Sequence, residues 1–558
     1  MKQILILLIS LSFSTTVFSQ KLHLDQLKAT TDSITRQLAQ DDEPGLSIGV
    51  VYRGQPILNA HYGLMNLDYE MKTSDSTLYN LASVSKHITA LGILLLEAEG
   101  KLQLQDKVSD HVPDLTGEYK NITINQLLHH TSGVPSTDNL LLFAGMSMDT
   151  PWTMAEELEL LKRYSQLNFE PGSEYMYSNG GYSLLAAVIE NTSGEDFEDF
   201  FRKRLFEPLD LQANVNNSSG KIIKNRARGY KPSETTYTDV LSESVPGASN
   251  FYFSMNDMIT WMNLFLQKNS RYEQQLTKMM TPSFVLSTGD TLSYSFGLNV
   301  KDYKGVQRVY HSGGTQGFAS YMLLFPEHEL GITVLTNNEK INVAKTIYQL
   351  TEEILTEFLI EEKPLERIAI SLPEETLHKW TGSYRMKDGM LLKIISENEK
   401  LFLVISDEQR FQLHPESETN FFIEEFDAQI TFLETGKGKP SHLNLIQGKS
   451  KQTGDYVAPQ ELSKASPAHH DLVGSYHQKA LAVTYSLIEK DGKLFLQLPG
   501  TFKKYLDFDV TILNPVAGYI FNTDRLGIIE FLRNERNEIS GFRFNDVGRL
   551  RNIEFNKI

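Results

Sequence analysis

Apolar residues alternate with polar ones near both ends of the first 360 residues, and follow a helical spacing between those ends. Two strand-like segments within residues 46–66 flank an Arg53-Gly54 turn, as in a β-hairpin. An apolar run at about residues 83–99 predicts a helix that stops at Gly100. Strand-like sequence returns after about residue 290, before a closing helix at about residues 342–358. Strands at both ends predict one antiparallel sheet flanked by helices, an α+β domain.

A different pattern follows this domain, because short alternating strands with hairpin turns replace the helical spacing. The sequence also repeats: TGSY at 381–384 returns as VGSY at 473–476, and KLFL at 400–403 returns at 493–496. The similar offsets of the two pairs keep the repeat in register. This pattern predicts two small antiparallel β-barrel domains.

Together these patterns predict the organisation of the chain. A polar segment with scattered Pro, Gly and Ser separates the two barrels and is interpreted as a linker. The expected parts are a signal peptide at 1–19, the α+β domain at 20–361, a first barrel at 376–448, the linker at 449–470 and a second barrel at 471–558.

The N-terminal segment is typical of a signal peptide. A positively charged start precedes the apolar run Ile4–Leu11, which is too short to span a bilayer. Small residues at Val17 and Ser19 predict cleavage before Gln20. We therefore expect an exported protein, periplasmic or secreted, with no stable membrane span after cleavage. A buried core helix or a retained anchor is the alternative.

Composition narrows the function classes. The chain has 53 Lys and Arg against 70 Asp and Glu, a formal net charge of −17, which argues against a nucleic-acid partner. It contains no cysteine, which excludes disulfides, thiol catalysis, Cys-ligated zinc and iron–sulfur clusters. We expect no cofactor and no metal, and a small-molecule or peptide substrate. The sequence leaves the oligomeric state open.

The sequence SVSK at 83–86 opens the apolar helix and is the first candidate for chemistry. Residues three apart share one face of a helix, so the Lys86 amine can reach the Ser83 hydroxyl. A serine becomes a good nucleophile when a nearby base takes its proton. A lysine can be that base only if desolvation or positive neighbours lower its pKa.

Two further short patterns lie downstream. The sequence YSN at 177–179 follows a Pro-Gly turn and precedes an apolar helix. The sequence HSGG at 311–314 ends a predicted strand. Each is weak alone, and only the order and context of all three together point to one chemistry.

Two other serines match short motifs without the required context. Ser218 and Lys221 repeat the Ser-x-x-Lys spacing, but in an Asn/Ser-rich loop with no apolar helix behind it. Ser47 lies in a Gly-x-Ser-x-Gly match, where a strand follows instead of the helix that a nucleophile elbow needs. Neither serine is predicted to be catalytic.

In their order along the chain, the three patterns at residues 83–86, 177–179 and 311–313 resemble the motifs of class C β-lactamases and related penicillin-binding-protein-like serine hydrolases. The resemblance extends over about residues 25–360, including the sequence ITINQLLHHTSG at 122–133. The two barrels are similar to the arrangement in D-aminopeptidases of this family, or to the lipocalin-like tails of some relatives. All three motifs precede the barrels, which indicates a hydrolase domain able to fold and acylate without them.

The resemblance implies a catalytic role for three residues. Ser83 would be the acylated nucleophile, and Lys86 would help to deprotonate it. Tyr177 would act as general acid and base, moving the proton to the leaving group. The reaction implied is cleavage of an amide or ester bond through an acyl-enzyme.

The resemblance also implies how substrate is held. Asn179, His311 and Gly313 would bind substrate, and the backbone N–H groups of Ser83 and Gly314 would form the oxyanion hole. His311 stands where the usual lactamases and carboxypeptidases have lysine, and imidazole is mostly neutral at pH 7. We therefore expect an activity similar to that of the family's D-aminopeptidases or esterases. A β-lactamase or D-Ala-D-Ala carboxypeptidase, and a non-catalytic binding or sensor module, are the alternatives.

Overall fold

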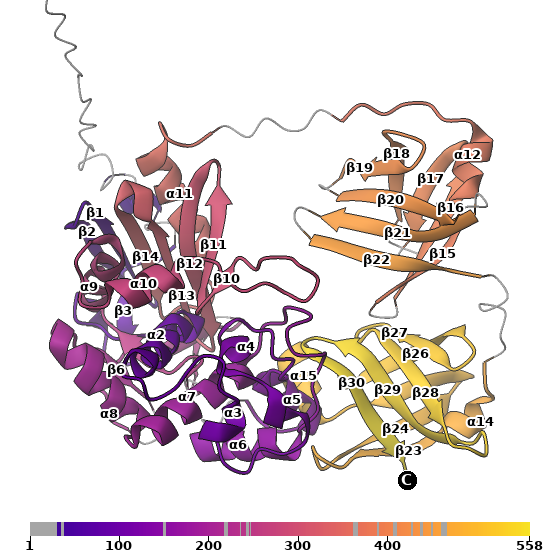
Figure 1. Ribbon diagram of the computed structural model, residues 1–558, viewed down its shortest axis with the longest axis horizontal. Coiled ribbons are helices and arrows are strands. Elements are labelled where there is room, and N and C mark those ends of the chain that lie inside the picture. Colours follow the sequence, from indigo (N-terminus) through magenta and orange to yellow (C-terminus); the bar gives the residue numbers. More distant parts are fainter. Residues whose placement is uncertain are drawn as a thin grey trace, which may run out of the picture.

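The computed structural model contains an N-terminal α+β domain and two β-barrels (Figure 1). The signal peptide expected at residues 1–19 lies outside the residues that the structure describes. The described residues are 29, 31–34, 38–148, 152–216, 221–234, 236–240, 245, 247–360, 367–387, 390–404, 410–425, 428–435, 439–447, 450–458 and 466–558.

A seven-stranded antiparallel sheet, in the order β10-β11-β12-β13-β14-β1-β2, forms the centre of the first domain. β1 (Leu46–Tyr52) lies between β2 (Gln55–Tyr62) and β14 (Leu330–Thr336). The first and last strands of the domain are therefore neighbours, and the expected α+β fold is confirmed. The other strands of the sheet are β10 (Tyr294–Ser295), β11 (Leu298–Tyr303), β12 (Val306–Thr315) and β13 (Phe318–Phe325).

One face of this sheet is covered by α11 (Val343–Leu355), which the sequence placed at about residues 342–358. Its Ile347 and Leu350 share a buried cluster with Ile48 and Val50 of β1. These two β1 residues are two apart, so they lie on the same face of the strand. The apolar positions of the alternation thus lie on the face of the sheet that α11 covers.

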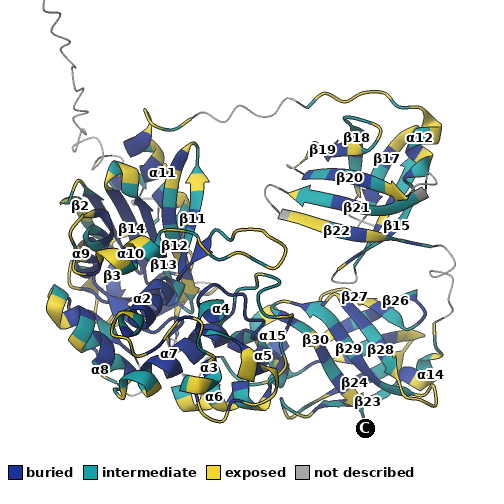
Figure 2. Ribbon diagram, in the orientation of Figure 1, coloured by how far each residue is buried: buried dark blue, intermediate teal, exposed yellow. Residues whose placement is uncertain are grey.

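The helix α2 (Ser85–Ala98) is buried in the layer on the other face (Figure 2). The single-turn 3-10 helix Ala82–Val84 leads into it, and Gly100 follows its end with a φ of +71°. A helix surrounded by protein is normally apolar all round, which makes a buried Lys86 an exception that needs explaining. The other α-helices that the structure describes in this domain are α3 (Val108–His111), α4 (Ile124–Leu128), α5 (Thr137–Ala144), α6 (Met154–Arg163), α7 (Asn179–Ser193), α8 (Phe197–Phe201), α9 (Met255–Leu266) and α10 (Glu273–Met279).

Short strands connect the helical layer to the sheet. A three-stranded sheet has the order β5-β9-β6, and two hairpins join β3 to β4 and β7 to β8. Their bounds are β3 (Leu64–Asn66), β4 (Met71–Lys72), β5 (Tyr79–Asn80), β6 (Asn214–Val215), β7 (Gly229–Pro232), β8 (Tyr237–Val240) and β9 (Phe251–Phe253).

Two closed antiparallel barrels follow, β15 to β22 and β23 to β30. The first strands of both contain the repeated Gly-Ser-Tyr. In each barrel this tyrosine donates a hydrogen bond to the backbone oxygen four residues earlier, Tyr384 to Trp380 and Tyr476 to Leu472. The repeat in the sequence therefore marks equivalent first strands, and the two expected barrels are confirmed. Their strands are β15 (Gly382–Met386), β16 (Leu391–Glu397), β17 (Lys400–Val404), β18 (Arg410–Pro415), β19 (Asn420–Ile423), β20 (Ala428–Thr435), β21 (Lys439–Gln447), β22 (Ser450–Val457), β23 (Gly474–Gln478), β24 (Val483–Lys490), β25 (Lys493–Gln497), β26 (Val510–Ala517), β27 (Ile520–Thr523), β28 (Ile528–Arg533), β29 (Ile539–Val547) and β30 (Leu550–Lys557). Among the described residues, three short helices accompany the barrels, α12 (Glu374–Lys379), α14 (His469–Leu472) and α15 (Gly500–Leu506).

The predicted start of the linker, residue 449, is too early. Residues 450–457 form β22, which closes the first barrel. This strand reads as polar because one of its inward positions is Gly454. A Cβ there would lie 2.6 Å from the sulfur of Met386, so a side chain from the neighbouring strand fills that space. Because Gly454 has no apolar side chain, the sequence pattern did not predict this strand.

The second barrel and the first domain share one apolar cluster, whereas the first barrel encloses a cluster of its own. The ring of Phe143 in α5 lies 5.2 Å from that of Phe502 and 5.6 Å from that of Phe544, between centroids. The Tyr485 hydroxyl donates a hydrogen bond of 3.0 Å to the Phe143 carbonyl. The second barrel is therefore joined to the hydrolase domain through a continuous core.

We expect removal of both barrels to destabilise the first domain, although the sequence alone indicated that it would fold without them. Fully burying a Phe side chain stabilises by about 1.5–3 kcal/mol, and truncation exposes several apolar residues around Phe143. A chain of residues 20–360 should aggregate or melt earlier than the full chain, measured by size-exclusion chromatography and thermal unfolding. The control replaces residues 367–458 with a Gly/Ser linker and retains the second barrel. A monomeric truncated chain with the melting temperature of the control would contradict this expectation.

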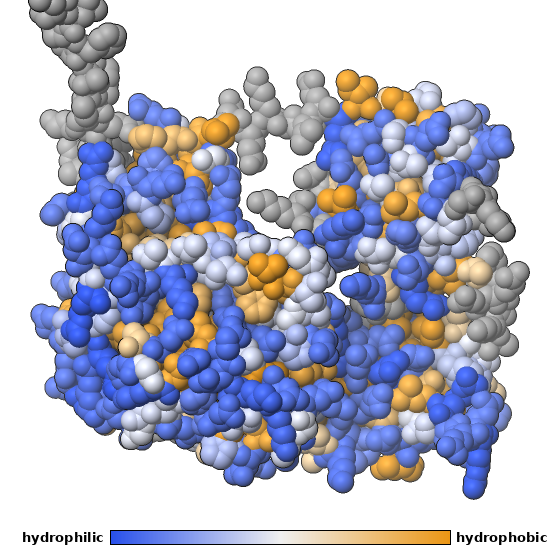
Figure 3. Space-filling model, in the orientation of Figure 1, coloured by the Kyte–Doolittle hydropathy of each residue, from blue (hydrophilic) through white to orange (hydrophobic). Residues whose placement is uncertain are grey.

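The surface is mostly hydrophilic on the face shown in Figure 3, with separate apolar patches. Within the described ranges, no helix combines the length and apolar character needed to cross a bilayer. Exposed large apolar side chains such as Tyr69 and Ile222 are scattered, which is ordinary for folded proteins.

Candidate active site

Ser83 lies in the strained turn that precedes α2. Ala82 has a φ of +46°, a conformation that is uncommon for a residue with a side chain, and its N–H donates to the Asn80 side chain at 2.7 Å. Ser83 is partly exposed, whereas Val84 and Lys86 are buried. The turn therefore presents the Ser83 hydroxyl beside an otherwise enclosed helix.

The Lys86 amine occupies a fully buried position next to Ser83. Its Nζ donates to Asn179 Oδ1 at 2.8 Å, to the Ala248 carbonyl at 3.1 Å and to Ser83 Oγ at 3.4 Å. Burial lowers the pKa of Lys86 well below its ordinary value, and the positive charge of Arg549 lowers it further. A lowered pKa increases the fraction of the amine that is neutral, and a neutral amine can accept a proton.

The start of α7 positions Tyr177 and Asn179. Ser178 caps this helix, with its hydroxyl accepting from the Gly181 N–H at 3.0 Å. The Tyr177 ring centroid lies 4.8 Å from Lys86 Nζ. Burial raises the pKa of Tyr177, and the Ser83 hydroxyl opposes that shift. Among the described residues the buried Tyr177 hydroxyl has no hydrogen-bonding partner with good geometry. It can therefore still donate or accept a hydrogen bond.

The glycines of β12 explain how this strand approaches Ser83. A Cβ at Gly313 would lie 2.4 Å from the Leu81 carbonyl oxygen and 2.9 Å from the Ser83 nitrogen, so a larger residue does not fit. At Gly314 a Cβ would meet nothing within 4 Å, so its backbone borders open space. This close approach suits an oxyanion hole formed by Ser83 and Gly314, which stays a prediction.

His311 is 4% exposed and belongs to a buried network of neutral groups. The Ser178 N–H donates to His130 Nδ1 at 3.1 Å, which leaves the proton of that ring on Nε2, 3.1 Å from the Tyr294 hydroxyl. Tyr294 in turn lies 3.3 Å from His311 Nε2, and His311 Nδ1 donates to the Ser312 carbonyl at 2.6 Å. Burial, with a smaller effect of Lys86, lowers the pKa of His311 to about 3. Both ring nitrogens are bonded within the protein, so contact of His311 with substrate stays a prediction.

A family description, "Beta-lactamase", matches residues 31–351, which is more than half of the chain. The chain belongs to the β-lactamase family. It is a serine hydrolase of this family, and the expected resemblance is confirmed. A second description, a domain of unknown function (DUF3471), matches residues 366–454, the region of the first barrel.

Comparison with individual proteins agrees with this membership. Penicillin-binding protein 4* of Bacillus subtilis (strain 168) is 29% identical over 401 residues, covering 68% of this chain and 88% of that protein. The octameric penicillin-binding protein homologue from Pyrococcus abyssi has a TM-score of 0.54 at 21% identity, covering 77% of this chain and all of that one. The D-amino acid amidase from Ochrobactrum anthropi SV3, solved with D-phenylalanine, has a TM-score of 0.50 at 20% identity, covering 60% and 99%. At these identities the two solved structures show the fold alone.

Ser47 does not belong to this site in the β-lactamase-family chain. Ser47 is fully buried in β1, where its hydroxyl is bonded to His61 Nδ1 at 2.8 Å and to the Tyr79 hydroxyl at 2.9 Å. It is a structural residue, as its context predicted. Ser218 lies outside the described residues, and Lys221 forms an ion pair with Glu198.

Two charged residues beside the β-lactamase-family site have no signal in the sequence. Asp138 in α5 accepts hydrogen bonds from the Ser136 hydroxyl and, at 3.4 Å, from Asn179 Nδ2. Arg549, in the turn between β29 and β30, has its guanidinium carbon 4.8 Å from the Tyr177 ring centroid. Arg549 belongs to a different domain from the motifs, so no spacing rule connects them.

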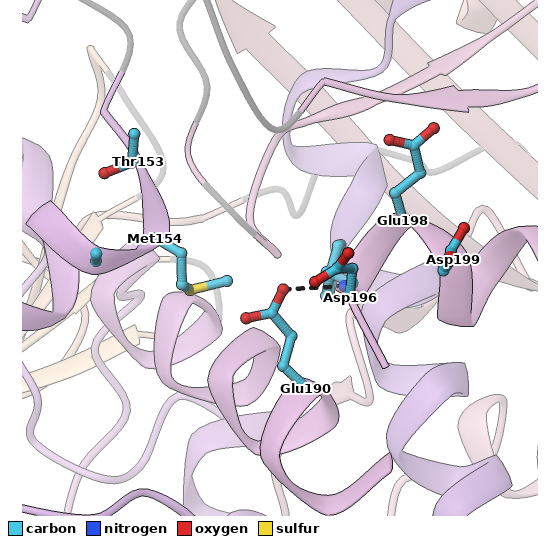
Figure 4. Close-up of a pocket in the computed structure, with 8 residues that line it drawn as sticks. Thr153, Met154, Glu190, Asp196, Glu198 and Asp199 are labelled. Carbon is cyan, nitrogen blue, oxygen red and sulfur yellow. Dashed lines mark hydrogen bonds between the residues drawn. The ribbon is translucent and has the colours of Figure 1, made fainter. Parts of the chain in front are cut away.

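A separate pocket of about 390 Å³ lies where α6, α7 and α8 meet (Figure 4). Glu190 reaches into it and accepts a hydrogen bond of 2.9 Å from the Phe197 N–H. Glu190 is 11 residues beyond Asn179 on α7, about 16 Å along a helix, so this pocket is not the Ser83 site. Within the part of the chain that the structure describes, no group of three or more His, Asp or Glu could hold a metal ion.

Proposed function

We propose that the chain is an exported serine hydrolase that cleaves an amide or ester bond through an acyl-enzyme on Ser83. The observation that carries the proposal is the buried Lys86, whose amine lies 3.4 Å from the Ser83 hydroxyl and whose pKa is lowered by burial. A hydroxyl beside a base of this kind is an activated nucleophile.

The geometry supports a sequence of four steps. The Ser83 proton passes to Lys86, directly or through Tyr177, as Oγ attacks the substrate carbonyl carbon. The oxyanion that forms is stabilised by the N–H groups of Ser83 and Gly314. Tyr177 then gives a proton to the leaving group as the bond to it breaks. Water, deprotonated by the same groups, hydrolyses the ester on Ser83 and restores the enzyme.

The neutral third motif favours an activity like that of D-aminopeptidases or esterases. His311, with its pKa lowered to about 3, brings no positive charge at neutral pH, unlike a lysine at that position. The fold shared with a D-amino acid amidase is compatible with this class of reaction. A β-lactamase or D-Ala-D-Ala carboxypeptidase is the second candidate, favoured by the similarity to penicillin-binding protein 4*.

Covalent labelling tests the proposal. The protein is incubated with a fluorophosphonate and separately with a fluorescent penicillin, and each sample is analysed by intact mass and peptide mapping. An adduct on Ser83 supports the acyl-enzyme. A panel of p-nitrophenyl esters, D-amino-acid anilides and nitrocefin then separates the two candidates. A folded protein that forms no adduct with either reagent would instead indicate a binding or sensor module.

His311→Lys tests the role of the third motif. A lysine ammonium beside a substrate carboxylate in a partly desolvated site contributes roughly 1–3 kcal/mol, which is about 5- to 150-fold in kcat/KM. We expect the kcat/KM of nitrocefin or a D-Ala-terminated peptide, divided by that of a neutral ester, to rise by this factor. The ratio is measured in wild type and variant at pH 7.5. An unchanged ratio would show that position 311 serves only the buried network and does not contact substrate.

A further inference from the structure

The second barrel brings one arginine to the candidate active site. The Arg549 guanidinium carbon lies 4.8 Å from the Tyr177 ring centroid, and its Nη1 lies 3.9 Å from an Asp138 carboxylate oxygen. That separation is an ion pair without a direct hydrogen bond. The Arg549 side chain is 41% exposed. The N–H donors of the Arg549 guanidinium are therefore close to Tyr177 and accessible to solvent.

Contacts with the hydrolase domain hold the turn that contains Arg549. Asn168 donates from Nδ2 to the Arg549 carbonyl at 3.0 Å, and its Oδ1 accepts from the Arg551 N–H at 2.8 Å. The Arg551 guanidinium donates to Glu174 at 2.8 Å. A Cβ at Gly548 would lie 2.6 Å from the Asn139 side-chain nitrogen, so the turn fits closely against α5. The backbone at Arg549 is thus positioned before any substrate arrives, which lowers the entropic cost of binding.

The charges around Arg549 leave it available to an anion. The Asp138 carboxylate does not serve Arg549 alone, because it also accepts hydrogen bonds from Ser136 and from Asn179. His311 is bonded within the protein and adds no cation of its own. A guanidinium matches a carboxylate by two parallel hydrogen bonds, which makes it a stronger and more selective receptor than a neutral imidazole.

We propose that Arg549 is a specificity residue that binds a carboxylate group of the substrate, so that the second barrel supplies the positive charge absent from the third motif. The inference rests on the proposed hydrolase function, since it concerns the substrate of the same site. It assigns the second barrel a part in substrate selection, at the α7 side of the site, in addition to its packing against α5.

Two pairs of isosteric substrates test this inference. In the first pair, p-nitrophenyl hemisuccinate is compared with the p-nitrophenyl ester of succinamic acid, so the carboxylate lies on the acyl part. In the second, the acetyl ester of 4-hydroxybenzoate is compared with that of 4-hydroxybenzamide, so it lies on the leaving part. The quantity measured is kcat/KM of the acid divided by that of its amide. Any effect on Ser83 or Lys86 acts on both members and cancels.

Arg549→Gln should lower this ratio by about 10-fold or more in at least one pair, the usual effect of losing a charge-assisted hydrogen bond. Arg549→Lys, which keeps the charge without the fork, should give an intermediate ratio. Arg543→Gln is the matched control, because Arg543 lies on β29 of the same barrel and pairs with Glu530 at 2.7 Å. Its ratios should equal those of wild type.

The outcomes separate this inference from the function on which it rests. If the full-length wild type forms the Ser83 adduct but Arg549→Gln changes neither ratio, the assignment of Arg549 is wrong and the hydrolase function stands. If wild type forms no adduct and hydrolyses no substrate of either pair, the proposed function fails and the inference fails with it. Equal losses in the Arg543→Gln control would show a general effect of barrel charge and would also overturn the assignment.

Discussion

Ser83→Ala is expected to abolish both turnover and covalent labelling while the protein stays folded. Ser83 presents a partly exposed hydroxyl in the turn just before α2, with the Lys86 amine 3.4 Å away, and alanine removes the proposed attacking atom without adding bulk. Loss of the nucleophile in a serine hydrolase costs on the order of 10⁶-fold in kcat. The measurements are kcat/KM with the best ester of the panel, adduct formation by intact mass, and thermal unfolding.

Ser85→Ala is the matched control for this variant. Ser85 belongs to the same Ser-x-Ser-Lys sequence, but it is fully buried and its hydroxyl accepts from the Phe251 N–H at 3.4 Å. We expect this variant to retain the adduct. Retention of the adduct in Ser83→Ala would mean that another serine is the nucleophile, and Ser218 would be tested next.

Tyr177→Phe is expected to lower kcat by about 10²–10⁴-fold and to change KM little. Phenylalanine keeps the ring that packs against His130, with 4.3 Å between centroids, and removes only the hydroxyl that we propose relays the proton. We assign this role to the Tyr177 hydroxyl because it lies buried next to Ser83 and has no hydrogen-bonding partner with good geometry among the described residues. Steady-state kinetics on an ester and on an amide provide the measurement.

Tyr119→Phe controls for the loss of a buried hydroxyl. Tyr119 is fully buried outside the site, and its hydroxyl likewise has no partner with good geometry among the described residues. The control should keep the kcat of wild type. An unchanged kcat in Tyr177→Phe itself would show that Lys86 alone, or a water molecule, transfers the proton.

Local patterns were sufficient for most of the hydrolase fold. Alternation at Ile48 and Val50 marks a strand with one face against α11, and a glycine at position 100, with a φ of +71°, follows the end of α2. Both are properties of a few neighbouring residues, which is why the sequence reveals them. The strand β22 was not predicted because one of its inward positions is Gly454, where the side chain of Met386 fills the space. A pattern of apolar side chains within one segment cannot show that a side chain from another strand fills a position in the core.

The autonomy of the domains could not be derived from the sequence. The repeat separates the barrels from the hydrolase domain correctly, but the aromatic cluster around Phe143, with Phe502 and Phe544, joins the second barrel to that domain. Apolar residues facing a neighbouring domain have the same spacing as those facing their own core. Only the packed structure distinguishes the two.

For the candidate active site, the sequence by itself identified the proposed reactive groups, because Ser83 and Lys86 are one helical turn apart and the other motifs follow in a recognisable order. The tertiary structure decided their electrostatic environment. The pKa of Lys86 is lowered first by burial and then by Arg549, and His311 is neutral because a network of buried groups encloses it. Desolvation and the charges of distant residues arise only when the chain folds, so a motif can name the acid and the base but not their protonation states.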